Sequence, residues 1–167
     1  MLSVFDGLRD VTTLSVFVRL ACALICGGII GIERSYKRRP AGFRTHILIC
    51  IGAAITTLTS QYLYLNMHYF TDMARLGAQV VAGIGFIGAG TIIVTKRQRV
   101  KGLTTAAGLW NSAIIGLTFG GGFYEGGILA TVFIMLAELV FSRIEYRVLE
   151  NVPEINLYME YLSLIHI

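Results

Sequence analysis

The stretch Leu76–Thr95, LGAQVVAGIGFIGAGTIIVT, decides the fold of this chain. Apart from Gln79 and the two threonines, its residues are apolar or glycine, and its length is about what a helix needs to cross a bilayer. Five of the twenty residues are glycines, each of which would cost a helix in water about 1 kcal/mol relative to alanine. Inside a membrane, small residues instead let two helices approach closely. The stretch therefore predicts a closely packed transmembrane helix.

One face of this predicted helix carries only small residues. They recur with helical spacing and are Ala78, Ala82, Gly85 and Ala89. Residues at that spacing share a stripe along a helix, and such stripes are typical of helix–helix contacts in membranes. We expect this stripe to be a packing seam and this helix to lie at the centre of the protein.

The composition excludes an ordinary soluble domain. The chain has 167 residues, of which 55% are hydrophobic and 14% charged, with a mean hydropathy of +0.70. Soluble domains contain about 25% charged residues. The net charge is +4, but the basic residues lie at the ends of apolar runs, so membrane topology explains them better than nucleic-acid binding does. We expect an all-α polytopic membrane protein, surrounded by lipid, with no nucleic acid as partner.

Five tightly packed transmembrane helices are predicted within residues 1–150. They cover, in order, Val11–Ile32, Thr45–Leu65, Leu76–Thr95, Leu103–Gly120 and Phe123–Ser142. The loops after the first and third helices are rich in arginine and lysine, and the loops after the second and fourth are poor in them. Because basic loops stay on the cytoplasmic side, this alternation predicts an outside N-terminus and a cytoplasmic C-terminus.

Residues 151–167 differ from the rest of the chain. Pro153 ends any helix, and from Ile155 the sequence INLYMEYL alternates in the manner of a strand. A lone strand is not stable in water. The tail is therefore either the start of a cytoplasmic domain that is cut off here or non-native sequence.

Arg19 is the first candidate for a functional charge inside the membrane. Intramembrane charges are costly and usually functional. Two interpretations stay open, a side chain that reaches the outer interface and a side chain with a buried partner. With the N-terminus outside, Gln79 and Glu125 share the outer half with Arg19, so one of them is the expected partner, in contrast to Glu138 near the inner end.

The inner end of the first helix offers a second group of candidates. Glu33 ends that helix and Arg44 opens the next, which predicts an ion pair that fixes the hairpin between them. A solvated basic loop that only sets topology is the alternative, and both can hold at once. Gly27 and Gly31 form a GxxxG pair, which predicts close helix packing.

The fourth helix carries hydroxyl and amide side chains in or near the membrane. Thr104 and Thr105 lie near its start, and Asn111 must find a partner in hydrocarbon. Hydrogen bonds between helices explain these residues, and a polar cavity against the third helix is the alternative.

The sequence predicts neither a catalytic nor a metal site. Its carboxylates lie at helix ends on opposite sides, and its three histidines form no catalytic or zinc motif. Gly83, Gly85 and Gly88 fit the spacing of a dinucleotide fingerprint but lack the strand and the acidic residue that this site requires. We expect a protein that is not an enzyme and holds no cofactor.

Three blocks of the chain resemble one family. GIERSYKRRPAGFRTHILICIGA, RLGAQVVAGIGFIGAGTII and VKGLTTAAGLWNSAIIGL occur in the order and at the spacing of the MgtC/SapB membrane proteins, also called MgtC/SapB/SrpB/YhiD. The resemblance implies a bacterial inner-membrane protein linked to growth at low magnesium and, in some pathogens, to virulence. It also implies a modulator of partner membrane proteins, notably the proton-translocating ATP synthase. Longer members carry a cytoplasmic ACT-like domain, which suits the strand-like tail.

The sequence supports two main hypotheses for function. The first is a regulator that binds another membrane protein through small-residue helix faces, with self-association as a competing use of those faces. The second is a transporter or channel for Mg²⁺, another ion or a small solute, along a polar path between the third and fourth helices. The candidate functional or packing residues are Arg19, Glu33, Arg34, Arg44, Thr45, Arg75, Gln79, Gly83, Gly85, Gly88, Gly90, Gly102, Thr104, Thr105, Trp110 and Asn111.

Overall fold

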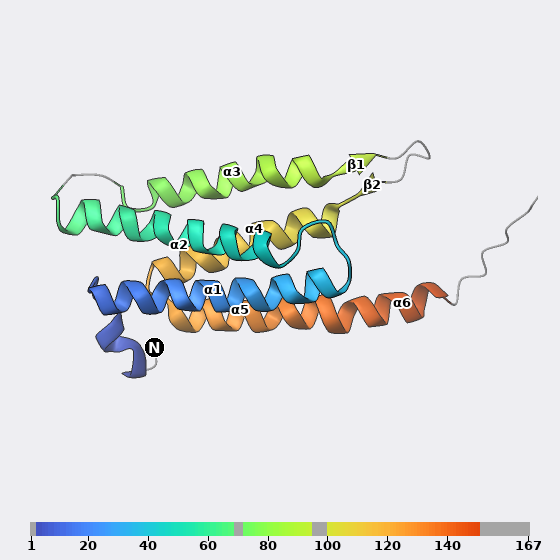
Figure 1. The fold of residues 1–167 in the computed structure, drawn as a ribbon, viewed down its shortest axis with the longest axis horizontal. Coiled ribbons are helices and arrows are strands. Elements are labelled where there is room, and N and C mark those ends of the chain that lie inside the picture. Colours follow the sequence, from blue (N-terminus) through green and yellow to red (C-terminus); the bar gives the residue numbers. More distant parts are fainter. Residues whose placement is uncertain (1–2, 69–71, 95–99, 151–167) are drawn as a thin grey trace, which may run out of the picture. The chain divides into compact units, whose positions relative to one another are not determined.

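The computed structural model describes residues 3–68, 72–94 and 100–150. It forms two compact units, one up to Met135 and one from Leu136 onward. The first unit begins with the short 3-10 helix η1 (Ser3–Leu8) (Figure 1). Its main helices are α1 (Thr13–Tyr36), α2 (Phe43–Leu65), α3 (Arg75–Thr91), α4 (Leu103–Gly120) and α5 (Tyr124–Leu136). The second unit contains the π-helical segment η2 (Ala137–Phe141) and α6 (Ser142–Glu150).

The fold is mostly helical, and α1 to α5 begin within a few residues of the predicted transmembrane helices. In the part of the chain that the structure describes, three helical runs are long and apolar enough to cross a membrane, namely α1, α2 and Tyr124–Ile144. α3 has 17 residues and α4 has 18, at the short end of the range for a transmembrane helix. A mostly helical fold with apolar helices of membrane-spanning length is confirmed, while the number of spans and the orientation of the termini stay predictions. The predicted strand after Ile155 lies outside the described residues.

Local sequence explains where α1 begins. The Thr12 hydroxyl accepts a hydrogen bond from the Ser15 amide at 3.2 Å, and the Ser15 hydroxyl accepts one from the Thr12 amide at 2.9 Å. This reciprocal arrangement satisfies amide groups that a helix leaves unpaired at its N-terminus.

α3 is shorter than predicted. Its last helical residue is Thr91, and Ile93–Val94 (β1) pairs antiparallel with Val100–Lys101 (β2). The prediction of a helix through to Thr95 is therefore wrong at its C-terminal end. The run Thr91–Val94 consists of β-branched residues, which favour extended backbone.

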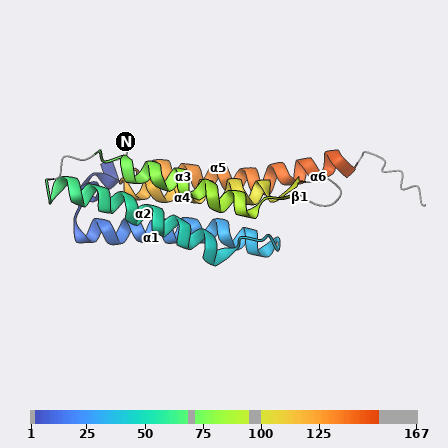
Figure 2. The ribbon, with the colours of Figure 1, turned by 90° about the horizontal axis from the view of Figure 1, so that it is seen from above.

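α2 is the helix against which its neighbours pack most closely. The GxxxG pair of α1 faces it, because a Cβ built on Gly31 would lie 2.7 Å from the Phe43 Cα. From α4, a Cβ on Gly120 would lie 2.5 Å from the Ala54 carbonyl oxygen, and one on Gly116 would overlap the Cys50 carbonyl oxygen. Figure 2 shows α2 alongside both α1 and α4. The close packing predicted at Gly31 and its GxxxG partner is confirmed.

α3 lies at the edge of the first unit, and its predicted place at the centre is wrong. Only Ile84 and Gly88 of this helix are buried, and a Cβ on Gly88 would lie 3.3 Å from the Ala106 Cβ of α4. The predicted seam is wrong as a contact within this chain, because all of its residues are exposed: Ala78, Ala82, Gly85 and Ala89. The helix is rotated so that its Ile84–Gly88 side faces α4.

α5 is mostly exposed. Its buried residues are Tyr124, Gly127 and Thr131. Tyr124 belongs to a core cluster with Phe119 of α4 and Ala23 of α1. The expectation of five tightly packed helices therefore holds for α1, α2 and α4 and is not confirmed for α3 and α5.

The helix ends that flank the two basic loops lie at one end of the first unit. The C-terminal ends of α1 and α3 lie at the same end of the first unit as the N-terminal ends of α2 and α4 (Figure 1). The loops predicted to face the cytoplasm are attached to these ends, so the arrangement is compatible with the predicted topology.

Candidate functional site

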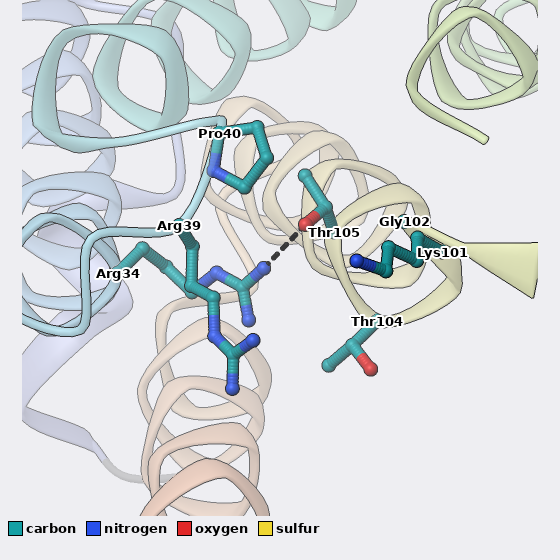
Figure 3. Close-up of a pocket in the computed structure, with 7 residues that line it drawn as sticks. All are labelled: Arg34, Arg39, Pro40, Lys101, Gly102, Thr104 and Thr105. Carbon is teal, nitrogen blue, oxygen red and sulfur yellow. Dashed lines mark hydrogen bonds between the residues drawn. The ribbon is translucent and has the colours of Figure 1, made fainter. Parts of the chain in front are cut away.

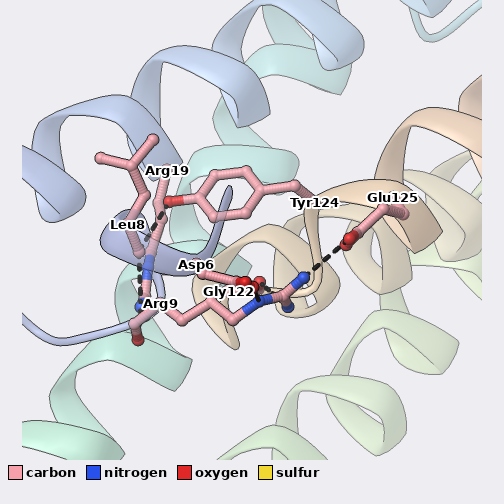
Figure 4. Close-up of polar contacts among 7 residues, drawn as sticks. All are labelled: Asp6, Leu8, Arg9, Arg19, Gly122, Tyr124 and Glu125. Atoms are coloured by element: carbon pink, nitrogen blue, oxygen red, sulfur yellow. Dashed lines mark hydrogen bonds and ion pairs between the residues drawn. The ribbon is translucent and has the colours of Figure 1, made fainter. Parts of the chain in front are cut away.

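Arg19 lies in a buried hydrogen-bond network at the other end of the first unit (Figure 4). It is 0% exposed, and its Nη1 donates to the Gln61 Oε1 at 2.8 Å and to the Gly120 carbonyl oxygen at 2.9 Å. Its Nη2 donates to the carbonyl oxygens of Arg9 and Leu8 at 2.5 and 3.3 Å. The interpretation of a side chain with buried partners is confirmed.

The predicted partners of Arg19 are wrong. Glu125 instead accepts a hydrogen bond and ion pair from the Arg9 Nη2 at 2.7 Å, and Gln79 is exposed on α3. The reason is the short helix η1, which folds back and brings backbone carbonyl groups to Arg19. A guanidinium group with five donors is satisfied by several neutral acceptors as well as by one carboxylate.

The same network joins η1 to α5. The Tyr124 hydroxyl donates to the Leu8 carbonyl oxygen at 3.1 Å, and the Tyr124 ring stacks on Phe5 with centroids 4.9 Å apart. Gly122 has φ +77°, and a Cβ there would lie 2.9 Å from the Arg19 Nη2. These bonds run between segments of the chain, so the network holds η1, α1, α4 and α5 together.

A pocket of about 390 Å³ lies at the end of the first unit where α1 ends and α4 begins (Figure 3). It is lined by Arg34, Arg39, Pro40, Lys101, Gly102, Thr104 and Thr105. Figure 3 shows the two arginines on one side of this pocket and Lys101, Gly102 and Thr104 on the opposite side. We call it the inner pocket.

The backbone positions these side chains. Arg34 lies in the last turn of α1, is 1% exposed, and donates from its Nη2 to the Thr105 Oγ1 of α4 at 2.7 Å. The Arg39 amide donates to the Arg34 carbonyl oxygen at 3.0 Å, so the turn after α1 folds over the helix end. Gly102 has φ +97°, and a Cβ there would overlap the Thr91 carbonyl oxygen, so the turn into α4 requires glycine.

Cationic side chains line the inner pocket. It is lined by two guanidinium groups and one ammonium group, and none of its lining residues is a carboxylate. It also includes the start of α4, whose first amide groups have no acceptor within the helix and carry the positive end of the helix dipole. Among the described residues there is no group of three or more metal-ligating side chains.

Glu33 makes a different ion pair from the predicted one. Its carboxylate is 2.6 Å from the Lys37 Nζ one turn along the same helix, and Arg44 is exposed at the start of α2. The predicted pair of Glu33 and Arg44 is wrong. Residues four apart on a helix are neighbours, which makes Lys37 the closer partner.

The remaining candidates do not gather in one place. Asn111 is partly exposed and Trp110 is 43% exposed, and both lie on α4. The exposed candidates on the other helices and turns are Arg44, Thr45, Arg75, Gln79, Gly83, Gly85 and Gly90. Only Arg34, Gly102, Thr104 and Thr105 come together, at the inner pocket.

Four residues of these sites were not predicted in their roles. Arg39 and Lys101 were interpreted only as topology signals, and Arg9 and Gln61 were not singled out. Gln61 is a polar residue in an apolar helix, which was a usable signal for an intramembrane hydrogen bond. The role of Arg9 depends on the fold of η1, for which the sequence carries no clear pattern.

One known protein family matches most of the chain. The family model of the MgtC family matches residues 20–147, from within α1 into α6, and so includes the inner pocket. The chain belongs to the MgtC family. The resemblance inferred from the three sequence blocks is thereby confirmed.

The relatives of this MgtC-family protein are bacterial. It is 42% identical over 143 residues to the Escherichia coli protein "Putative magnesium transporter YhiD", covering 83% of this chain and 66% of that protein. It is 37% identical over 131 residues to Protein MgtC of Salmonella typhimurium, covering 78% of this chain and 54% of that protein. It is 36% identical over 126 residues to Protein SapB of Bacillus subtilis, covering 73% of this chain and 54% of that protein.

The chain thus spans between about half and two thirds of the length of these relatives, 54% to 66%. None of their names assigns a catalytic activity. No solved structure matches the chain. Family membership and the apolar helices identify a multi-pass protein of the bacterial inner membrane.

Proposed function

We propose that this protein is not an enzyme and that it modulates a partner membrane protein by binding it through α3. The observation that carries the proposal is the exposed stripe of small residues on that helix, Ala78, Ala82, Gly85 and Ala89. The stripe was predicted as a packing seam, and within the described ranges (3–68, 72–94 and 100–150) it stays exposed.

The glycines of α3 support this proposal. A Cβ built on Gly83, Gly85 or Gly90 would meet nothing within 4 Å. Packing within the chain therefore does not require glycine at these positions. Small residues on an exposed transmembrane face allow a second helix to approach closely, which is a main source of helix association in lipid. Phe86, 85% exposed, offers an apolar contact beside the stripe.

The proposed link to magnesium comes from relatives of this chain. YhiD carries magnesium in its name, and the family resemblance implies adaptation to low magnesium through partners such as the proton-translocating ATP synthase. We propose the same context for this chain, with a partner that is an integral membrane protein.

Leucine substitution on the stripe tests the proposal. Gly85→Leu fills the stripe, and Gly52→Leu on α2 is a matched control because a Cβ there also meets nothing within 4 Å. Both variants should keep the melting temperature of the parent in detergent. Recovery of one defined cross-linked membrane partner should fall at least tenfold in Gly85→Leu and stay unchanged in Gly52→Leu. Equal recovery from the two variants would contradict the proposal.

Magnesium transport is the second candidate, favoured by the name of YhiD. Asn111 is partly exposed and lies on α4, the helix that faces α3, where the polar path was predicted. Mg²⁺ influx into liposomes that contain the folded protein, lost in Asn111→Leu, would establish transport. Absence of influx for the parent protein would remove this candidate.

A further inference from the structure

We propose that α6 lies in the interface between membrane and water, with its apolar side against the lipid chains of the bilayer surface. This inference concerns the last described helix of the chain, and it does not depend on partner binding by α3. The helical run that is long enough to cross a membrane ends at Ile144, within the first turn of α6. The following residues of α6 therefore lie beyond the membrane-crossing run.

Apolar side chains continue past the end of this run. Ile144 and Val148 lie four residues apart on α6, so they share one side of the helix, and Phe141 precedes them by one turn. These three side chains are 51%, 64% and 65% exposed, in that order. The described residues therefore leave most of this apolar side uncovered.

The position of this side along the helix favours lipid as its contact. Tyr124–Ile144 has 21 residues, which at 1.5 Å per residue gives about 31 Å, close to the thickness of the hydrocarbon core. Val148 lies four residues further, or about 6 Å along the axis, where lipid headgroups replace lipid chains. The apolar side of α6 thus continues the exposed apolar surface of the same helical run, on which Phe133 is 67% exposed.

The polar side of α6 suits the headgroup layer. Arg143 and Arg147 are both exposed and lie four residues apart, so they share a second side of the helix. Arginine side chains can keep their stems on apolar surface while the guanidinium groups reach water and phosphate. The sequence of α6 contains two arginines and two glutamates, so its formal net charge is zero. Burial of the apolar side, and not attraction to anionic lipid, therefore supplies the binding.

The segment η2 provides a bend at the right place. Its π-helical turn interrupts the α-helical pattern directly before α6, and the Ser142 hydroxyl donates to the Glu138 carbonyl oxygen at 2.6 Å. Both features are known causes of helix bending. A bend at η2 turns α6 away from the axis of the membrane-crossing run and keeps Ile144 and Val148 against lipid chains.

Fluorescence quenching of the whole chain in liposomes tests the proposal. In a variant without the three native cysteines, an environment-sensitive fluorophore is attached at Val148→Cys on the apolar side or at Arg147→Cys on the polar side. One quencher is a phosphatidylcholine with a nitroxide high on its acyl chain, and the other is iodide in the water on both sides of the bilayer. Two exposed positions serve as controls, Phe133→Cys for lipid and Arg38→Cys for water.

The proposal predicts opposite responses from neighbouring positions. The nitroxide should quench Val148→Cys several-fold more than Arg147→Cys, and iodide should quench Arg147→Cys more. Two results would overturn the proposal, provided that both controls respond as expected. Equal quenching of Val148→Cys and Arg147→Cys by iodide would place α6 in water. Protection of Val148→Cys from both quenchers would assign its apolar side to a protein surface.

Discussion

At the scale of single residues, two buried arginines connect helices at opposite ends of the first unit. Arg19 bonds to Gln61 and to backbone carbonyl oxygens of η1 and α4, and Arg34 joins α1 to Thr105 of α4. A buried charge is tolerated only where hydrogen bonds replace water. The sequence placed Arg19 within an apolar helix but did not predict its partners, because carbonyl groups are present at every residue and leave no trace in the sequence.

Removal of the Arg19 side chain should destabilise the protein strongly. Arg19→Met leaves the Gln61 amide oxygen and several carbonyl oxygens without their donor, and each unsatisfied buried group costs about 1–3 kcal/mol. The variant should melt well below the parent in detergent, as followed by intrinsic fluorescence. Arg44→Met, which alters an exposed arginine, should melt within a degree or two of the parent. Similar melting of both variants would contradict the assigned role.

A single methyl group should suffice to disrupt the contact between α4 and α2. In Gly116→Ala the new Cβ overlaps the Cys50 carbonyl oxygen, so the helices must separate, and overpacking costs typically about 1–3 kcal/mol. Thermal melting should therefore shift downward. Gly52→Ala, where the Cβ meets nothing within 4 Å, should melt no lower than the parent. A shift of equal size in both variants would show that the change in melting temperature comes from helix propensity and not from the close contact between α4 and α2.

At the scale of elements, the sequence predicted where the helices lie along the chain better than it predicted which helices pack against one another. Composition shows that a helix is apolar and rich in small residues, as in Leu76–Thr95, but not whether its small face meets its own chain. α2 packs against glycines of α1 and α4. The residues that allow this close packing, Gly31 and Gly116, therefore belong to the neighbouring helices and not to α2 itself. The GxxxG pair of α1 was predictable from spacing, while the edge position of α3 was not.

The orientation of these elements can be tested with single cysteines. In a variant without the three native cysteines, Arg38→Cys lies in the turn between α1 and α2, and Asn66→Cys lies at the end of α2. Since the basic turn is predicted to be cytoplasmic, a membrane-impermeant maleimide should label Asn66→Cys in intact spheroplasts. It should label Arg38→Cys only after lysis. The reverse labelling pattern would show that the topology is opposite to the predicted one.

At the scale of the whole molecule, the described part of the chain presents surfaces that its own packing does not use. One is the small-residue stripe of α3, and another is the inner pocket between α1 and α4. Thr104, Thr105 and Gly102 were predictable members of the pocket from the polar start of α4. Arg39 and Lys101 were not, because a basic loop that sets topology and a basic loop that lines a pocket have the same composition.

The central claim is that the α3 stripe binds another membrane protein. Site-specific photo-cross-linking in native membranes, with a photoreactive residue at Ala82 or at Leu48, tests it most directly. Leu48 is the control, since it is 70% exposed on α2 outside the stripe. The account predicts one discrete product from Ala82, with a mass other than twice that of the chain, and none from Leu48. Identical product patterns from both positions, or a product from Ala82 that contains only this chain, would contradict it.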